Sequence, residues 1–266
     1  VRNLNFLFVR KTKNKKLTPI GEIYNFKIVN LNKDYISLDS SFLSLLQDTT
    51  FRKYLIDSIQ YSLNKYDSLY KEELWQDGFI LYQKYSRKDV FRILNYNENP
   101  VAINVGGYLI SPDNSNCPIF VNYHKDEDIS ESTKYEDKFI NQSEFEWQSK
   151  SKRTLQSNDV QTILGKKGEI RLPLFIKKKN DEGDDFYYMG NIIPIKDKVE
   201  ETTIQDDKGK KVPIVRISFK LESPVESGIY NYIIEDSIKD NSPSEVLSEI
   251  EAEEIKVPEI EQTFTI

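Results

Sequence analysis

The hydrophobic pattern changes along this chain, and that change constrains the fold more than any other feature of the sequence. Between Asp39 and Tyr70, large apolar side chains recur at spacings of four and three residues, which is typical of one buried helix face. From Pro112 to Tyr232, short apolar runs alternate with polar turns, which is typical of a small β-barrel or sandwich. The sequence therefore predicts an α+β fold. The helical face expected in the core consists of Phe51, Leu55, Ile59, Leu63 and Tyr66.

Local signals place the other elements. A strand pair is expected at 6–9 and 20–31, joined by the basic turn 11–16. Ser86 is a favourable N-cap, and Asp89 suits the positive end of a helix dipole, so a second helix should begin there. Further strands are expected at 119–121, 170–176, 186–189, 192–195 and 212–221, with a hairpin turn at 180–184 and a short helix at 158–164.

These elements group into three predicted domains. Residues 1–98 are expected to form an N-terminal β-hairpin and helical subdomain that connects to other parts of a longer protein, and 99–236 a small β-barrel. Residues 237–266 are expected to form an acidic tail, partly helical from Ser244 to Glu254. The absence of an initial Met favours a fragment, and residues 1–16 do not resemble a signal peptide.

The scarcity of two residue types excludes several kinds of site. The chain has one cysteine, Cys117, and one histidine, His124, so it can hold no internal disulfide, Cys-cluster zinc site or two-His metal site. No apolar run approaches the ~20 residues of a membrane-spanning helix. These counts fit a protein of the reducing cytoplasm with no membrane partner and no metal of its own.

Charge is distributed unevenly. The chain carries −6 overall, but Glu235 to Ile266 holds ten acidic and two basic residues, a net charge of −8. The segment from Trp147 to Lys179 holds nine basic and two acidic residues, a net charge of +7. The basic segment is compatible with nucleic-acid binding although the whole chain is acidic.

One short motif within the basic segment combines the groups that bind a nucleotide. Trp147 is followed by Gln148, hydroxyl-bearing residues and the cations Lys150, Lys152 and Arg153, without an apolar residue. An aromatic ring can stack on a base, an amide or hydroxyl can bond its edge, and cations hold phosphates. The alternative, judged equally good from composition, is that Trp147 lies in the core and the cations are solvated.

Catalytic motifs are weak or missing. Gly165-Lys166 lacks the rest of a Walker A motif, and His124 lacks both the nucleophile elbow of a hydrolase and the spacing of phospholipase-D-type nucleases. Asp113, Glu136 and Lys138 match the loose PD-(D/E)xK nuclease pattern, which is short and common by chance. The chain is therefore expected to have no catalytic residues of its own.

Longer stretches carry a specific resemblance, which covers about 81–232. It rests on residues 85–95, 117–125, 129–139, 147–155 and 181–190, in the same order. The series resembles the DUF3427 domain at the C-terminus of bacterial DEAD/DEAH-helicase-like proteins, among them type IV, modification-dependent restriction enzymes similar to SauUSI. In those enzymes a phospholipase-D-type nuclease and a helicase motor precede this region, which is the target-recognition domain.

The resemblance implies a PUA/SRA-like barrel that binds duplex DNA containing 5-methylcytosine or 5-hydroxymethylcytosine, with the base flipped into a pocket. ATP and Mg²⁺ would belong to other domains of the parent chain, whose helicase and nuclease domains would be its partners. The expected pocket consists of Trp147, Gln148, Ser149, Tyr123, Tyr135, Asp137 and Tyr188. The expected DNA-backbone contacts are Lys150, Lys152, Arg153, Lys166, Lys167, Arg87 and Lys88.

Two other functions stay open at this point. The barrel could be a PUA-like binder of RNA or unmodified nucleic acid. Alternatively, the chain could be a protein-interaction module that couples helicase and nuclease domains, with the acidic tail as a docking arm.

Overall fold

The computed structural model describes residues 3–69, 74–100, 107–124, 137–206 and 208–235. The helices are α1 (Ile20–Ile23), α2 (Ser40–Leu45), α3 (Thr49–Leu69), α4 (Arg87–Ile93), α6 (Asn158–Ile163) and α7 (Ser227–Ile234), with a 3-10 turn η3 (Asn180–Glu182). The strands of the N-terminal part are β1 (Arg10–Lys13), β2 (Lys16–Pro19), β3 (Val29–Leu31), β4 (Ile36–Leu38), β5 (Trp75–Gln76), β6 (Phe79–Ile80) and β7 (Lys84–Ser86). The remaining strands are β8 (Ile119–Asn122), β9 (Lys138–Asn141), β10 (Glu144–Gln148), β11 (Pro173–Lys177), β12 (Asp185–Gln205) and β13 (Lys211–Leu221).

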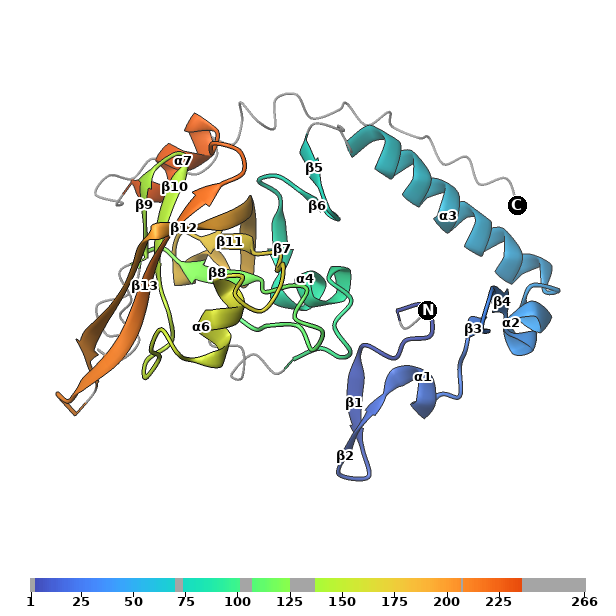
Figure 1. Ribbon diagram of the computed structural model, residues 1–266. Helices are drawn as coiled ribbons and strands as arrows, with labels where there is room; N and C mark the ends of the chain where they lie inside the picture. The colour runs from blue at the N-terminus through green and yellow to red at the C-terminus, as the bar shows by residue number, and fades with distance from the viewer. Residues whose placement is uncertain (1–2, 70–73, 101–106, 125–136, 207, 236–266) are drawn as a thin grey trace.

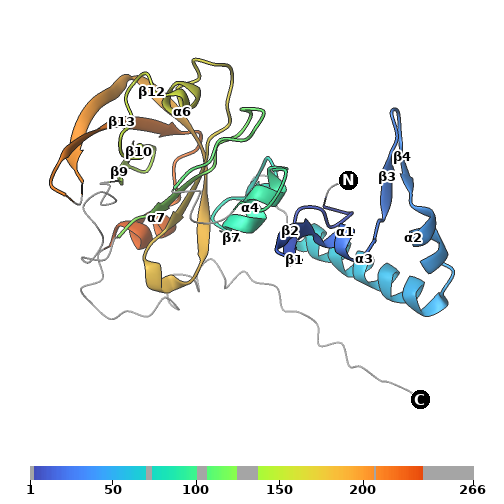
Figure 2. The same ribbon diagram turned by 90° about the horizontal axis from the view of Figure 1, so that it is seen from below.

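Seven strands form one curled sheet in the order β8-β11-β12-β13-β10-β9, with β7 beside the first part of β12. Only β8 and β11 run parallel among the pairs of this sheet in the described residues. Between the pairs Pro194–Phe219 and Val199–Ile217, β12 advances five residues while β13 advances two. Extra residues in one strand bend it, and the sheet curls into a half-barrel (Figures 1 and 2).

The two outer strands of the curl approach each other through side chains. The Phe139 amide donates a hydrogen bond to the Tyr123 hydroxyl (3.2 Å). Helix α7 adds contacts here, because His124 Nε2 lies 2.8 Å from the Ile233 carbonyl oxygen. Within the described residues β8 and β9 share no strand ladder. The fold is thus α+β with a half-barrel sheet, and a closed PUA/SRA-like barrel stays a prediction.

The sheet packs a core on each face. Strand alternation directs one set of side chains into the curl, where Phe145, Leu174 and Ile217 are fully buried beside α6 and α7. The neighbouring residues of β8, β11 and β12 face the other way, against α4. This outer core contains Phe8, Phe79, Val90, Phe91, Phe120, Phe175, Phe186 and Tyr188. The domain boundary predicted between residues 98 and 99 therefore cuts through a continuous core, which both sides help to form.

The N-terminal arm, defined as residues 3–69, extends away from the half-barrel (Figure 1). A chain of ring contacts from Phe6 through Phe26 and Phe42 to Phe51 holds its pieces together. Beyond that point α3 is open to solvent: Ile59 and Leu63 are each 51% exposed. The prediction that this helix face lies in the core is wrong for most of its length, because the described residues place no element over it.

Several local predictions are confirmed. Ser86 caps α4, where its hydroxyl accepts from the Asp89 amide (3.2 Å). The expected strands of the β domain and the helix α6 form, although 186–195 lies in one continuous strand rather than two. The helical segment 39–70 divides into α2 and α3.

The predicted position of the N-terminal strand pair is wrong, because the basic run that was expected as the turn itself forms β1 and β2. No helix among the described residues is long and apolar enough to span a membrane.

Candidate nucleic-acid interface

Trp147 lies inside the half-barrel. It is 3% exposed, and its ring centroid lies 5.2 Å from that of Tyr108 and 5.9 Å from that of Phe219. The strand β10 continues its alternation up to this residue, so Trp147 points inward like Phe145 two residues earlier. Of the two alternatives that the sequence leaves open for Trp147, the structure favours a core residue, because little of its ring is accessible to a base.

Two of the three polar residues expected to address a base edge, Asp137 and Ser149, form hydrogen bonds within the fold. Asp137 Oδ1 accepts from the Gln148 amide (2.9 Å). The Ser149 hydroxyl is fully buried, accepts from the Val215 amide (2.9 Å) and donates to the Lys150 carbonyl oxygen (3.1 Å). Gln148 Oε1 is buried with no hydrogen-bond partner in the part of the chain that the structure describes. Asp137 and Ser149 thus add side-chain hydrogen bonds at the end of β10, where its strand ladders with β9 and β13 stop.

Of the tyrosines expected to form the other walls, the two that the structure describes, Tyr123 and Tyr188, pack in different cores. Tyr188 is fully buried in the outer core, with its ring 5.0 Å from Phe79, so it lies on the opposite face of the sheet from Trp147. Tyr123 lies where β8 approaches β9. Tyr135 lies outside the described residues. The predicted pocket residues that the structure describes therefore do not assemble one base pocket, because Trp147 and Tyr188 point to opposite faces of the sheet.

Several of the cations that follow Trp147 are partly engaged. Lys150 Nζ donates to the Tyr108 carbonyl oxygen (3.0 Å) and lies 4.2 Å from the Tyr108 ring centroid. Burial lowers the pKa of Lys150. Arg153 Nε donates to Asp159 Oδ2 (2.6 Å), which also accepts from the Tyr108 hydroxyl (2.8 Å). Lys152 is exposed at a left-handed turn, with a φ of 63°. Of these three cations, only Lys152 is fully at the surface.

Asp159 is the centre of this polar cluster. Desolvation raises the pKa of its carboxyl, but hydrogen bonds from Arg153 and Tyr108 outweigh that effect, so the pKa lies below its usual value. The same pairing raises the pKa of Arg153. The cluster joins α6 to the segment after β10 and to Tyr108.

The remaining predicted phosphate contacts divide between two places. Lys166 and Lys167 are exposed on the loop between α6 and β11, and Lys167 contacts Asn158. Arg87 and Lys88 belong to α4, where the Arg87 guanidinium lies 4.8 Å from the Phe186 ring centroid in the outer core. Burial lowers the pKa of Arg87, against the opposing effect of Asp184. Lys88 is exposed.

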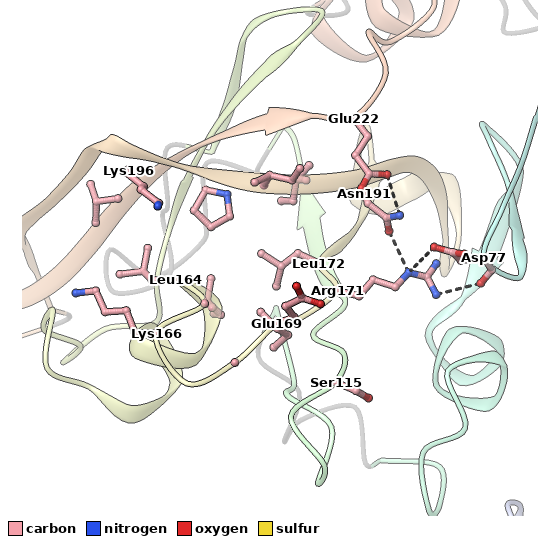
Figure 3. Close-up of a pocket in the computed structure, with 18 of the residues that line it drawn as sticks. Asp77, Ser115, Leu164, Lys166, Glu169, Arg171, Leu172, Asn191, Lys196 and Glu222 are labelled. Atoms are coloured by element: carbon pink, nitrogen blue, oxygen red, sulfur yellow. Dashed lines mark hydrogen bonds and ion pairs between the residues drawn. The ribbon is translucent and has the colours of Figure 1, made fainter.

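A cavity of about 1450 Å³ lies between the α6–β11 loop and β12 (Figure 3). This volume exceeds the ~300–1,000 Å³ of an ordinary small-ligand site. Among the described residues that line it none is aromatic, and its apolar wall consists of Leu155, Ile163, Leu164, Ile170, Leu172, Ile192, Ile193, Pro194 and Val199. A planar ligand would therefore pack between aliphatic side chains.

The two ends of the cavity differ in charge. Lys166 and Lys196 lie at one end, and a network around Arg171 lies at the other (Figure 3). Arg171 Nε donates to Asn191 Oδ1 (3.2 Å), and Asn191 Nδ2 donates to Glu222 Oε2 (3.1 Å). Arg171 Nη1 donates to the Asp77 carbonyl oxygen (3.0 Å). The network joins the loop before β6 to β12 and to the residue after β13.

Carboxylates at this second end are open to a ligand. The Asp77 side chain lies 3.6 Å from Arg171 Nε and is 66% exposed, and Glu222 is also exposed. Arg171 Nη2 is buried and makes no well-aligned hydrogen bond to any residue that the structure describes. Burial raises the pKa of Tyr188 to about 12, and the positive charge of the Arg171 guanidinium opposes this rise. The arrangement can accept a hydrogen bond from an amino group at one end and bind an anion at the other.

Of the residues that line this cavity, only Lys166 is predicted from the sequence as a site residue. Lys166 and Arg171 belong to the basic segment, but Asp77, Asn191 and Glu222 come from other elements. The tertiary fold brings these residues together from separate elements, so no local signal marks them.

The nuclease pattern is not assembled in the described residues. Asp113 Oδ1 accepts from the Ser111 hydroxyl and from the Ser115 amide and hydroxyl, so it closes a turn. These bonds, led by that from Ser111, lower its pKa to about 2. Glu136 lies outside the described residues, and no cluster of metal-binding side chains occurs within them.

Comparisons with known proteins give one family. A family model described as a domain of unknown function, DUF3427, matches residues 79–233, which is more than half of the chain. No curated protein matches the sequence.

Three solved structures show a distant similarity. The MspJI restriction endonuclease in complex with a 27-mer oligonucleotide is 12% identical, with a TM-score of 0.31, over 43% of this chain and 31% of that chain. SUVH6 of Arabidopsis thaliana in complex with SAM is 11% identical, with a TM-score of 0.33, over 64% of this chain and 32% of that chain. The sulfur-binding and SRA domains of ScoMcrA, complexed with phosphorothioated DNA, are 9% identical, with a TM-score of 0.35, over 86% of this chain and 70% of that chain. The chain spans about a third of the length of the first two structures.

Proposed function

Because this chain belongs to the DUF3427 family, we propose that it is the DNA-recognition domain of a modification-dependent restriction enzyme. In this proposal it binds duplex DNA that contains 5-methylcytosine or 5-hydroxymethylcytosine and receives the modified base after the base leaves the stack. The chain itself performs no chemistry. ATP, Mg²⁺, the helicase motor and the nuclease belong to other domains of the parent protein, which acts in the cytoplasm.

The observation that carries the proposal is the cavity with unlike ends. A cytosine has an exocyclic amino group that donates hydrogen bonds, and the carboxylates of Asp77 and Glu222 can accept them. Lys166 and Lys196 at the other end suit the phosphates that flank the base. We place the modified base here rather than at Trp147, since Trp147 is buried and this cavity is open.

The aliphatic wall bears on the modification itself. A methyl group buried against side chains such as Leu164, Ile170 and Pro194 gains on the order of 1 kcal/mol. This gain is smaller than that of the phosphate contacts, which act on every duplex alike. Discrimination between modified and plain DNA therefore depends on the fit of the base, and overall affinity depends on the cations.

Two variants separate these contributions. Glu222→Gln replaces a carboxylate acceptor of the amino group with an amide. It should weaken binding of methylated duplex by about 1–2 kcal/mol and binding of plain duplex much less, because in this proposal only the modified base enters the cavity. Lys166→Gln combined with Lys196→Gln should weaken binding of both duplexes by the same factor and lower the dependence on salt. Glu22→Gln, an exposed change in the N-terminal arm, is the matched control for Glu222→Gln.

The measurement is fluorescence anisotropy with labelled duplexes that differ only in cytosine methylation, with an RNA duplex of the same sequence beside them. Equal affinity of the unmodified protein for methylated and plain DNA would refute modified-base recognition. Preference for RNA would favour the PUA-like RNA-binding alternative.

A second role is favoured by α3. Its exposed side chains Ile56, Ile59, Leu63 and Tyr66 suit a protein contact, and the helicase and nuclease domains of the parent protein are the candidates. Isothermal titration of the separately produced helicase region with this chain tests that contact. Loss of binding in Ile59→Asp would support it, and unchanged binding would refute it.

A further inference from the structure

The hairpin of β1 and β2 concentrates positive charge at one point of the N-terminal arm. Its seven residues from Arg10 to Lys16 include five cations and no acid. All seven are exposed, and the hairpin projects from the molecule (Figure 1). It lies outside residues 79–233, which the family model matches.

The strand register gives the hairpin a basic face and a second, mixed face. Lys13 lies opposite Lys16, and Lys11 lies opposite Thr18, so these side chains share one side of the ribbon. Arg10 lies opposite Pro19 on the other side, where it forms an ion pair with Glu98. The salt bridges of the described residues include none to the three lysines of the basic face.

This arrangement works against the stability of the free hairpin. Like charges directly opposite each other in an antiparallel pair are destabilising, and Lys13 and Lys16 form such a pair beside the turn. The turn itself is Asn14-Lys15, with φ values of 50° and 63°. Glycine is the usual second residue of this turn because the left-handed conformation strains a side chain. The hairpin thus carries lysines at two places where an isolated hairpin would be more stable without them.

The hairpin is attached firmly to the β domain. Phe8, two residues before β1, is 2% exposed in the outer core. The Asn5 side chain bonds the Ile28 and Val29 amides (both 2.9 Å), which fixes the returning chain. A Cβ at Gly21 would collide with the Asn5 carbonyl oxygen, so the close approach at the base of the hairpin requires glycine. The basic face therefore has a defined position relative to the half-barrel.

We infer that the basic face of this hairpin is a second DNA site, which binds the phosphate backbone of the duplex whether or not the duplex is modified. A polyanion supplies negative charge between Lys13 and Lys16 and removes their repulsion. Duplex DNA provides a continuous row of phosphates, and a two-stranded β-ribbon fits its major groove. The inference rests on the proposed function only in taking duplex DNA as the ligand.

A different occupant of the hairpin would be the acidic segment 236–266 of the same chain, which carries a net charge of −7. DNA is favoured because its charge density is higher and because the chain is proposed to meet it. The two occupants predict opposite effects: removal of the lysines weakens DNA binding if they hold phosphates, and strengthens it if they hold a competing acidic segment.

The experiment uses the full chain with four lysines of the hairpin neutralised together, as Lys11→Gln, Lys13→Gln, Lys15→Gln and Lys16→Gln. The matched control neutralises Lys27, Lys33, Lys53 and Lys65, which are exposed elsewhere in the arm, by the same substitution. Binding to methylated and plain duplex is measured by anisotropy at several salt concentrations, and far-ultraviolet circular dichroism verifies that each variant folds.

We expect the affinity of the hairpin variant for both duplexes to fall at least about tenfold at low salt. Its salt dependence should be shallower, by about 0.9 for each phosphate that the hairpin no longer neutralises. The affinity of the control should fall much less. Equal decreases in the two variants, an unchanged affinity of the hairpin variant, or a gain in its affinity would each overturn the inference. The proposed function fails separately, if the unmodified protein does not distinguish methylated from plain duplex.

Discussion

Two aromatic-rich regions of this protein differ in what surrounds them. Trp147 is followed by a polar, basic run in the sequence, yet it is 3% exposed within the half-barrel. The helix α3 has a regular apolar face, yet Ile59 and Leu63 are 51% exposed. The apolar face of α3 is thus exposed although its pattern predicts burial, and Trp147 is buried although polar and basic residues follow it.

The difference shows what a hydrophobic pattern specifies. Periodicity determines which side chains share a face, and both regions obey it: Phe145 and Trp147 share one side of β10, and Ile59, Leu63 and Tyr66 share one side of α3. It does not determine whether another element covers that face. The inward face of β10 packs in one core with α6 and Tyr108, whereas no described element covers most of the apolar face of α3.

The largest effect is expected for Trp147→Ala. Removal of this side chain from the inner core should lower the free energy of unfolding by about 3–5 kcal/mol, and the midpoint of thermal unfolding by on the order of 10 °C. The chain's other tryptophan, Trp75, is 38% exposed, so Trp75→Ala is the matched control and should cost considerably less. Calorimetry measures both. A Trp147→Ala protein that melts normally but loses preference for methylated DNA would restore the base-stacking interpretation.

An intermediate effect is expected for Asp159→Asn, which breaks the charged contact that attaches α6 beside β10. Its hydrogen bonds to Arg153 and Tyr108 are partly solvated, so the decrease in stability should be about 1–2 kcal/mol at pH 7. Asp57→Asn on the exposed helix α3 should change stability little. Urea denaturation gives the free energies.

The same substitution has a defined dependence on pH. Because the folded-state pKa of Asp159 is lowered, its stabilisation is complete above the unfolded value of about 3.9 and disappears as the pH falls through the folded value. The difference between the unmodified protein and Asp159→Asn should therefore be largest near neutral pH and shrink below about pH 4. A difference that grows in acid would contradict the assignment of Arg153 and Tyr108 as partners of the ionised carboxylate.

The smallest effect is expected for Ile59→Ala in α3, and it tests the comparison most directly. Ile217→Ala, the same change in the fully buried part of β13, should cost about 2–5 kcal/mol. Ile59→Ala should change stability by less than about 0.5 kcal/mol, because alanine has the higher helix propensity and little burial is removed. Chemical denaturation of the two variants side by side gives the contrast. Similar costs at both positions would mean that α3 has a partner in solution.

Local sequence patterns were enough to predict most elements of the β domain. The alternation around Leu174, the N-cap at Ser86 and the short helix at 158–164 depend on side chains only a few residues apart, so local patterns indicate them. The DUF3427 resemblance was also readable, because it rests on contiguous stretches and the family model matches 79–233. The α+β class follows from the same signals.

The tertiary structure alone decides which faces are covered and which distant residues lie together. Asp77, Arg171, Asn191 and Glu222 form one end of the cavity although they are far apart in the sequence. Trp147 is buried because β13 and α6 lie beside it, and Arg87 packs in the outer core because β12 places Phe186 there. These outcomes depend on strand register and on the bend in β12 between Pro194 and Val199. Such long-range pairing is a property of the whole chain, since no single segment contains both partners of the contact.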